Sequence, residues 1–535
     1  MEKFFAVVEK VNTFINDLVW GWPMIILILG TGILLTVRTK VLQVRKFGMS
    51  CGETIVPTVK SIGKKHKSNK KENTVSPFEA FATAISGTVG TGNIIGVSSA
   101  IMTGGPGAVF WMWISAFFGM VTNYAENVLG MFFRKKDNLG GFAGGPMYYL
   151  SEGIGRNSKG KKGAFLKGFG KVLGIMAAVF CMLAAIGMSG AQTNKMSITF
   201  QSVFTSVDKT TVALIVGIIV AVVLALVILG GIKTIGRVCS ILVPFMSLLF
   251  ILMALVIIFV NITAIGTAFA LIFSNIFSFG AVAGGVGGYM FAQIIKKGLA
   301  RGVFSNEAGL GSSVIAHSAS ETREPVKQGF WGIFEVFFDT FVICTLTALV
   351  VLVSIDTNTI YATDVKGELL LKDTQVSMMA FESVFKGFGT AVYSIIVPLF
   401  AFTTILAWSY YGEKCVDFLF RKTGDKGRRI ATTAFKVLYV LLVIVASVMD
   451  GELAWAISDT FNGLMALPNL IGLVIMSGLV AKITKNYLDR KKGLDVKPML
   501  SAYDEQNEEF ILDIAKENAG SESSEEAAAE TAEIA

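Results

Sequence analysis

Charge, histidine and cysteine are scarce in this sequence. Charged residues make up 16% of the chain and hydrophobic residues 53%, whereas soluble proteins carry about 25% charged residues. The two histidines, His66 and His317, are expected in separate polar loops, which argues against a histidine metal site. The cysteines form no C-x-x-C motif, so neither a zinc site nor a disulfide framework is indicated. Composition therefore predicts a polytopic membrane protein without a cofactor, and it offers no nucleophile–base pair for an enzyme.

Positive charge is concentrated ahead of the C-terminal tail. The net charge is +8, but the tail from Ser501 holds 11 acidic residues and one lysine, so the first 500 residues carry +18. This excess indicates cytoplasmic loops facing an anionic lipid surface, and nucleic acid is a poor partner for so apolar a chain. The N-terminus lacks a basic stretch followed by a cleavage site, so no signal peptide is predicted. We expect the acidic tail to be disordered.

Long apolar runs predict eleven membrane-spanning helices. The predicted spans are 19–37, 78–102, 108–133, 170–204, 212–231, 239–262, 268–295, 328–354, 376–412, 430–449 and 453–483. Ten Lys or Arg residues lie in loop 38–75 and five in 421–429, whereas loop 355–375 has two lysines. Because basic loops stay in the cytoplasm, this alternation places the N-terminus outside and the C-terminus inside the cell membrane. Residues 1–20 are predicted to form a short amphipathic helix on the membrane surface.

Glycines interrupt the span 78–102 at its centre. The segment from Ile85 to Gly96 reads I-S-G-T-V-G-T-G-N-I-I-G, and each glycine costs a helix roughly 1 kcal/mol relative to alanine. Backbone without helical partners must be buried in protein or line a cavity at membrane depth. The segment is therefore a candidate broken helix that binds substrate and ions, although close helix packing through Gly92 and Gly96 is an open alternative. A dinucleotide-binding motif is excluded by the glycine spacing and by the absence of a preceding strand.

A second glycine-rich interruption, at 280–288, is predicted in the span 268–295. Without the first span, ten spans remain and divide into two sets of five, each opening with a broken span. An odd number of spans gives the two sets opposite orientations, and paired interruptions in inverted halves predict a transport site at the middle of the membrane. The predicted organisation is an N-terminal segment and extra helix (1–40), a basic cytoplasmic loop (41–77), two five-helix repeats (78–263 and 264–484) and the cytoplasmic tail (485–535).

Several motifs resemble one transporter family. The segment from Gly104 to Gly119, G-G-P-G-A-V-F-W-M-W-I-S-A-F-F-G, resembles the signature of the alanine-or-glycine:cation symporters, also called sodium:alanine symporters, of the amino acid–polyamine–cation superfamily. The segments G-T-V-G-T-G-N-I-I-G, F-S-N-E-A-G-L-G-S-S and T-T-I-L-A-W-S-Y-Y-G-E resemble the same family. The resemblance covers roughly residues 15–490. It implies an all-α leucine-transporter-type (LeuT-type) 5+5 inverted repeat with one extra N-terminal helix, and sodium-coupled uptake of a small neutral amino acid such as alanine or glycine.

The first break offers hydrogen-bond donors for an amino-acid carboxylate, namely the N–H groups of Gly90, Thr91 and Gly92. The family resemblance implies substrate contacts from Gln192 and Asn194, although polar helix packing is the alternative for that pair. Trp408 and Phe279 could wall a small apolar pocket, or simply pack against neighbouring helices. The complete predicted substrate site is Gly90, Thr91, Gly92, Asn93, Gln192, Asn194, Phe279, Gly284, Thr404 and Trp408.

A sodium ion is predicted to travel with the substrate. The hydroxyls of Thr403 and Thr404 suit a hard cation, and the fold resemblance adds the carbonyls of Ser86 and Val89. Threonines in membrane helices also commonly bond their own i−4 carbonyl, which is the competing interpretation.

Three intramembrane carboxylates, Glu126, Glu335 and Asp339, would instead serve a proton-coupled carrier. A glutamine or other neutral amino-acid carrier and, in a different class, an ion channel are the alternative functions. The F-S-N-E-A-G-L-G segment, with Ser305 as a possible helix cap, is expected to form an inner gate or merely a loop.

Overall fold

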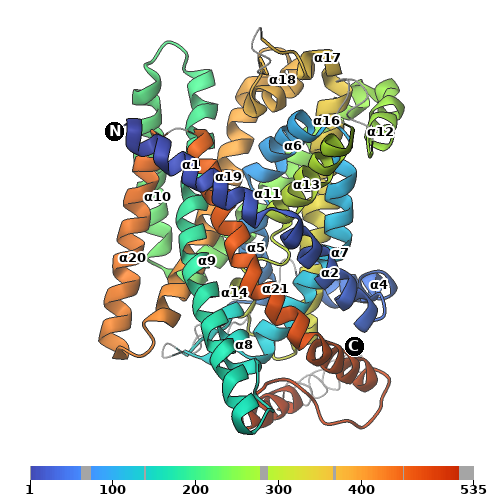
Figure 1. Cartoon of the computed structure of the whole chain (residues 1–535), viewed down its shortest axis with the longest axis vertical. Helices are drawn as coiled ribbons and strands as arrows, with labels where there is room; N and C mark the ends of the chain where they lie inside the picture. Colours follow the sequence, from blue (N-terminus) through green and yellow to red (C-terminus); the bar gives the residue numbers. More distant parts are fainter. Residues whose placement is uncertain are drawn as a thin grey trace, which may run out of the picture.

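The computed structural model describes residues 2–61, 74–137, 140–277, 287–364, 369–449 and 451–516. These residues are almost entirely helical, with one short antiparallel hairpin, β1 (Lys135–Lys136) and β2 (Phe142–Ala143). Within them, nine helices are long and apolar enough to cross a membrane, and the bent pair Pro77–Thr88 and Gly92–Gly104 makes up to ten. The helices stand side by side along the long axis of the molecule (Figure 1).

Most predicted spans correspond to helices with shifted ends. The helices are α1 (Glu2–Val19), α2 (Trp22–Arg38), α5 (Pro77–Thr88), α6 (Val97–Gly104), α7 (Ala108–Phe132), α9 (Gly160–Val203), α10 (Lys209–Ile228), α11 (Gly231–Val260), α12 (Ile265–Ser274), α13 (Gly287–Asn306), α15 (Pro325–Val336), α16 (Thr345–Ser354), α19 (Gly389–Leu419), α20 (Gly424–Ser447) and α21 (Gly451–Arg490). A π-helix, η4 (Phe337–Cys344), joins α15 to α16. Pro398 lies inside α19.

The predicted span 376–412 is wrong as a single helix. It is divided between α18 (Asp373–Phe385) and α19, because Lys386 and Gly387 adopt positive φ angles between them. A short helix, α17 (Thr357–Ile360), precedes α18, and both lie at the upper end of the molecule in Figure 1.

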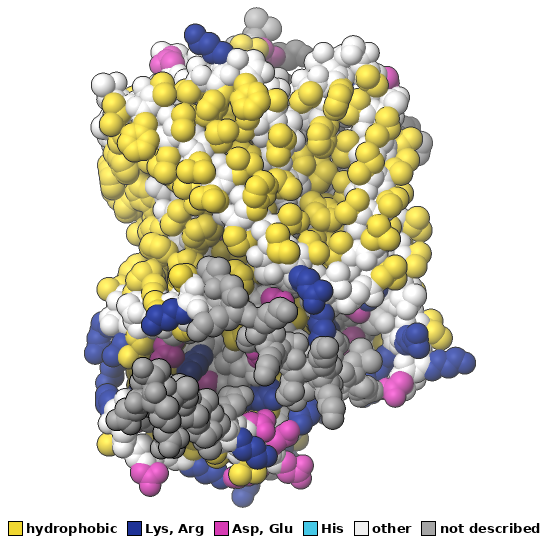
Figure 2. Space-filling view, turned by 180° about the vertical axis from the view of Figure 1, so that it is seen from behind, with side chains coloured by type: hydrophobic (Ala, Val, Ile, Leu, Met, Phe, Trp, Pro, Cys, Tyr) yellow, Lys and Arg dark blue, Asp and Glu magenta, His cyan; other side chains and the backbone are white. Residues whose placement is uncertain are grey.

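An apolar belt surrounds the bundle. Large hydrophobic side chains on α10, α11 and α20 are exposed, for example Leu226, Ile241 and Leu438. Figure 2 shows hydrophobic side chains over the middle and upper part of one face, with Lys and Arg side chains gathered at the lower end. Exposed apolar surface of this extent marks contact with lipid.

Three predicted loops contain packed structure. The segment predicted as the loop 41–77 includes α3 (Leu42–Arg45) and α4 (Phe47–Ser61), and Ser50 Oγ donates to the Phe330 carbonyl at 3.0 Å. The hairpin and α8 (Pro146–Gly153) occupy the predicted loop between α7 and α9, with Met147, Tyr149 and Leu150 buried. In the tail predicted to be disordered, 504–516 are helical as far as the described residues extend. In each case apolar side chains become buried, which explains why the segment is folded where a loop or disorder was predicted.

Two sets of helix contacts hold the region of the first predicted break. Helix α9 packs along α19 and α21, while α5 packs on α11 and α19. The connection from α5 to α6 therefore lies inside the molecule, where its backbone is shielded from lipid.

Candidate functional site

The predicted first break is present between α5 and α6. A capping box of Ser76 and Glu79 starts α5. After Thr88 the chain leaves the α-helix, forms a π-helix over Gly92–Gly96 (η1), and continues as α6 at an angle of 47° to α5. Every residue from Val89 to Gly96 is buried. Non-helical backbone at this depth provides N–H and C=O groups that a ligand can bind.

Side chains from within and outside the break occupy two of its backbone donors. The Gly90 N–H donates to Asn93 Oδ1 at 2.9 Å, and the Thr91 N–H donates to Gln192 Oε1 of α9 at 3.2 Å. An incoming carboxylate would compete with these two amide oxygens. The Thr91 hydroxyl is buried and has no hydrogen-bond partner among the described residues, so it is the ready ligand of the break. The structure thus brings Gln192 to the predicted site.

Helix α19 closes the other side of the break. A methyl group on Gly90 would overlap with Thr404 Oγ1, and one on Gly87 would lie 2.8 Å from the Tyr411 hydroxyl. Thr404 Oγ1 donates to the Phe400 carbonyl at 2.9 Å, its own i−4 position, as the competing interpretation expected. The Thr404 oxygen atom nevertheless lies close to Gly90. Gly87 and Gly90 therefore fit both the packing interpretation and the binding-site interpretation, because they allow the helices to pack closely and leave the backbone accessible.

The predicted sodium residues fall into two groups. Thr404 lies on the break, whereas Thr403 Oγ1 donates to Leu399 and Phe400 carbonyls, both at 3.1 Å, and approaches Met246 of α11. Ser86 Oγ donates to the Thr83 carbonyl at 2.8 Å and contacts Cys239, also of α11. Val89, the C-cap of α5, is fully buried.

The second helix interruption at the site lies at 306–313. The predicted interruption at 280–288, with Phe279 and Gly284, falls almost entirely outside the described residues. Helix α13 runs past the predicted span end at residue 295 and stops at Asn306. Positive φ angles at Glu307, Gly309 and Gly311 then separate it from the short helix α14 (Val314–His317). Because this segment is buried throughout, the prediction of an exposed cytoplasmic loop is wrong, whereas the alternative of an inner gate stays a prediction.

Asp339 of η4 joins the two breaks. Its Oδ1 accepts from Asn93 Nδ2 at 2.6 Å, and its Oδ2 accepts from Ser305 Oγ at 3.0 Å and Thr340 Oγ1 at 2.8 Å. Ser305 therefore bonds a distant carboxylate and is not a helix cap. Asn306 Nδ2 donates to Thr340 Oγ1 at 3.1 Å. No ion pair to Asp339 occurs within the described residues, and the side chains that donate hydrogen bonds to this buried carboxyl group are all neutral.

Trp408 and Glu307 form a second link between α19 and the interruption at 306–313. Trp408 Nε1 donates to Glu307 Oε1 at 3.0 Å, and Ser312 Oγ donates to the other carboxyl oxygen. The Trp408 ring packs edge-on against Tyr411. Trp408 therefore contacts this interruption through a polar contact that the sequence did not indicate, and its predicted role in walling the substrate pocket stays a prediction.

The other two intramembrane carboxylates lie away from the first break. Glu126 Oε1 accepts from Asn469 Nδ2 at 2.5 Å, and the same amide nitrogen donates to the Gly309 carbonyl at 2.8 Å. Glu335 Oε2 lies 2.9 Å from His317 Nε2, and both side chains are fully buried. His317 is thus part of the interior, which corrects its placement in a polar loop.

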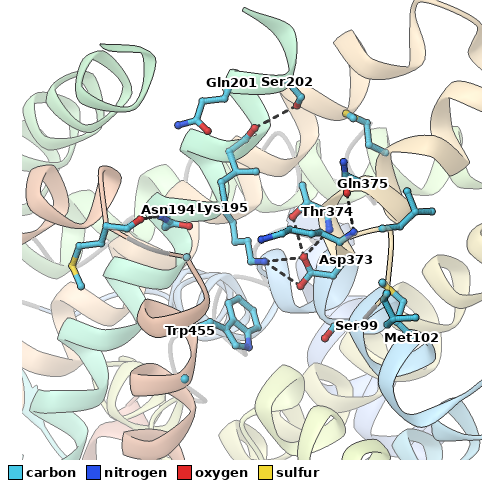
Figure 3. A pocket seen from close by; sticks show the side chains of 18 of the residues that line it. Ser99, Met102, Asn194, Lys195, Gln201, Ser202, Asp373, Thr374, Gln375 and Trp455 are labelled. Atoms are coloured by element: carbon cyan, nitrogen blue, oxygen red, sulfur yellow. Dashed lines mark hydrogen bonds and ion pairs between the residues drawn. The ribbon is translucent and has the colours of Figure 1, made fainter. Parts of the chain in front are cut away.

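Asn194 faces a different space from Gln192. It lies two residues, and so about 200° of helix rotation, farther along α9. Its Nδ2 donates to the Met449 carbonyl at 2.7 Å, and the residue lines a cavity of about 1300 Å³ at the α18 end of the molecule. Figure 3 shows it beside Lys195, whose Nζ pairs with Asp373 at 2.9 Å across that cavity. Asn194 therefore does not line the first break in this structure, and its contact with the substrate stays a prediction.

An aromatic pair separates the cavity from the break. The Phe304 ring lies 3.6 Å from where a Gly92 methyl would be, and its centroid is 5.0 Å from that of Trp455, which lines the cavity. The Arg301 guanidinium lies over both rings, at 5.5 Å and 5.2 Å. Sequence reasoning missed Phe304, Ser305, Asn306 and Glu307 as site residues. The succession of polar residues and glycines in F-S-N-E-A-G-L-G is the sequence pattern that could have indicated them.

Comparison with known proteins gives consistent matches over nearly the whole chain. A family model described as "Sodium:alanine symporter family" matches residues 5–500. The chain is 41% identical to "Sodium/alanine symporter AgcS" of Methanococcus maripaludis, over 91% of this chain and 98% of that protein. It is 32% identical to "Probable sodium/glutamine symporter GlnT" of Bacillus subtilis, over 91% and 92% of the two chains. A solved Na+-coupled sialic acid symporter in a substrate-bound outward-open state matches with a TM-score of 0.50 at 14% identity, over 85% of this chain and 92% of that one, which supports the fold alone.

Proposed function

Because the chain belongs to the sodium:alanine symporter family and has the leucine-transporter-type fold, we propose that it carries alanine or glycine into the cell together with Na+. The contact network that joins Asn93, Asp339 and Ser305 supports this proposal most directly, because it brings two interrupted helices together in a buried, polar space. Backbone breaks that meet at membrane depth are the places where transporters of this architecture bind substrates and ions.

The amino-acid carboxylate binds at the first break. It takes the Thr91 hydroxyl and displaces the amide oxygens of Gln192 and Asn93 from the Thr91 and Gly90 N–H groups. Both donors lie near the start of η1 and α6, where the helix dipole favours an anion. The Phe304 ring over Gly92 leaves little room beyond a short side chain, which favours alanine or glycine over a larger substrate such as glutamine.

Sodium binds between α5 and α19. The Thr404 hydroxyl beside Gly90, with the carbonyls of Ser86 and Val89, offers the neutral oxygen ligands that a hard cation prefers. The Thr403 hydroxyl, which approaches Met246 of α11 in this structure, would have to turn toward α5 to join them. The two substrates then move by alternating access, with the N-terminus outside and the C-terminus in the cytoplasm. One net charge moved inward at 100 mV supplies about 2.3 kcal/mol, nearly fifty-fold accumulation.

Asp339 supports a second candidate for the coupling ion. A carboxyl group buried among neutral donors is costly to ionise unless a cation accompanies it. It would therefore hold either a second Na+ or a proton, next to both breaks. Glu126 and Glu335 are weaker candidates for proton coupling because neither contacts the first break.

Alanine uptake into proteoliposomes tests the proposal, with Na+ or K+ outside and with glycine and glutamine as competitors. We expect Na+-dependent uptake in which glycine competes better than glutamine. Gln192→Ala and Thr404→Val should each raise the alanine or sodium concentration for half-maximal uptake by roughly 5- to 140-fold, equivalent to 1–3 kcal/mol. Ser409→Ala, which removes another hydroxyl of α19 bonded only to its own helix, is the matched control.

Two results would contradict parts of this account. Uptake driven by a proton gradient in Na+-free buffer, and lost in Asp339→Asn, would assign the coupling to Asp339 and a proton. Sodium-independent flux that does not saturate with alanine would support a channel instead.

A further inference from the structure

The described part of the acidic tail folds back onto the end of the bundle opposite α17 and α18 (Figure 1). Residues 504–516 are helical, and Phe510 is fully buried together with Leu500 and Phe142 of β2. The Phe142 and Phe510 rings pack edge-on with centroids 5.8 Å apart. An otherwise acidic, solvent-facing segment therefore has an apolar anchor, and we refer to 498–516 as the tail clamp.

Polar contacts fix the position of the tail clamp. Asn507 Oδ1 accepts from the Leu500 and Ser501 N–H groups at 2.8 Å and 3.0 Å, which orders the approach to the helix. The Ala502 N–H donates to the Phe132 carbonyl at the end of α7 at 2.8 Å. Arg156, between α8 and α9, donates to the Ala502 carbonyl at 2.5 Å.

Charged groups extend this attachment to two further segments. Glu509 pairs with Lys136 of β1 at 2.5 Å. Asp513 Oδ2 pairs with Arg323 Nε at 3.3 Å, where the two side chains are 32% and 13% exposed. Arg323 belongs to the segment 318–323, which connects α14 to α15. The tail clamp thus touches the end of α7, the hairpin and the segment that follows the second break.

Arg134 lies beneath the tail clamp and donates hydrogen bonds to the segment 318–323. Its side chain is fully buried, with Nη1 donating to the Ser320 carbonyl at 2.6 Å and Nη2 to the Thr322 carbonyl at 2.5 Å. The guanidinium lies 3.9 Å from the Phe142 centroid and 5.4 Å from that of Phe510. The aromatic anchor of the tail therefore covers the cation that holds this segment.

The segment 318–323 connects in turn to both broken helices. The Val75 N–H donates to the Ala319 carbonyl at 3.2 Å, and the Glu321 N–H donates to the Val75 carbonyl at 2.9 Å. Val75 lies two residues before α5, which leads to the first break, and Ala319 lies two residues after α14, which follows the second break. At the opposite end of the molecule lies the 1300 Å³ cavity. At the end that carries the clamp, this series of contacts connects the start of α5, the end of α7 and the segment that follows α14.

We propose that the tail clamp holds closed the path from the two breaks to the end of the molecule predicted to be cytoplasmic, so that its release favours the inward-facing state. The proposal rests on the alternating-access cycle described above. Movement of α14 or α5 relative to α7 would open that end. The segment 318–323 follows α14 and bonds Val75 ahead of α5, so either movement would strain its contacts with Arg134 and the clamp. A contact made in one state only shifts the equilibrium by its own free energy.

Labelling of Cys344 reports on this path, because its Sγ contacts Asn93 and Ser305 at the junction of the breaks. A membrane-impermeant thiol reagent is applied to the clamp side of the full-length protein in which Cys344 is the single remaining cysteine, because Cys51, Cys181, Cys239 and Cys415 are replaced by serine or alanine. Phe510→Ala should raise the Cys344 labelling rate more than about tenfold, because it removes a fully buried aromatic ring. Asp513→Lys should raise it roughly two- to fivefold, as expected for a partly exposed ion pair.

Two controls make the experiment decisive. Leu512→Ala alters an exposed residue (59%) of the same helix and should leave the rate unchanged. The exchange of charges in Arg323→Asp with Asp513→Lys should return the rate toward that of the parent protein. Unchanged labelling in Phe510→Ala, in protein whose tail has become sensitive to protease, would overturn the proposal. Because labelling requires no substrate, failure of sodium-driven uptake would refute the proposed function without affecting this result.

Discussion

Gly90 is the position where the proposed site tolerates least change. A methyl group there would overlap with Thr404 Oγ1 and lie 3.4 Å from Gln192 Nε2, so Gly90→Ala forces apart the two helices that form the site. Adding a methyl group to a packed interior typically costs about 1–3 kcal/mol. If the packed arrangement is the substrate-bound one, this cost appears as a roughly 5- to 140-fold loss of apparent affinity for alanine and Na+.

Gly96→Ala is the matched control for this substitution. Gly96 lies in the same π-helix and is buried, but nothing lies within 4 Å of a methyl group added to it. The assay is alanine uptake at varied alanine and sodium concentrations, with the amount of folded transporter checked by size-exclusion chromatography. Equal transport by Gly90→Ala and the parent protein, or a larger loss in Gly96→Ala, would refute the placement of the site against Thr404.

Two further substitutions test the surroundings of the site. Trp408→Phe removes the hydrogen-bond donor to Glu307 and should lower the free energy of unfolding by about 1–3 kcal/mol, measured as a reduced thermal midpoint. Trp331→Phe, at a tryptophan stacked on Phe81, is the control and should lower the free energy of unfolding less. Equal losses in the two variants would mean that the polar contact is unimportant. Exchanging the charges of Lys195 and Asp373, which are 10% and 25% exposed, should change the alanine concentration for half-maximal uptake less than about fivefold. The change should appear mainly at low ionic strength. A large loss of apparent alanine affinity at all salt concentrations would place Lys195 in substrate binding.

Much of the fold can be predicted from the sequence because a lipid environment restricts which segments can cross it. Spans must be long and apolar, and a helix interrupted by glycines must be buried, which identified the first break correctly. The span 376–412 was misjudged because the positive φ angles at Lys386 and Gly387 occur inside an otherwise continuous pattern. The tail was wrongly predicted to be disordered because its overall composition is acidic, and composition does not show that the single side chain of Phe510 is buried.

The second interruption at the site shows where sequence reasoning reaches its limit. The polar residues from Ser305 to Ser313 look like a loop because their partners lie far away in the chain: Asp339, Trp408 and Asn469. Only the folded structure shows that these partners satisfy a polar segment inside the bundle. The separation of Gln192 from Asn194, by contrast, follows from helix geometry, since residues two apart lie on nearly opposite faces.

The most direct test of the central claim is alanine-evoked entry of radioactive sodium into proteoliposomes that contain the purified protein. Coupled transport requires that sodium enters together with alanine in a fixed ratio, and this entry should be lost in Thr404→Val but retained in Ser409→Ala. Alanine uptake without accompanying sodium, or sodium entry unaffected by Thr404→Val, would contradict coupled transport through the two breaks.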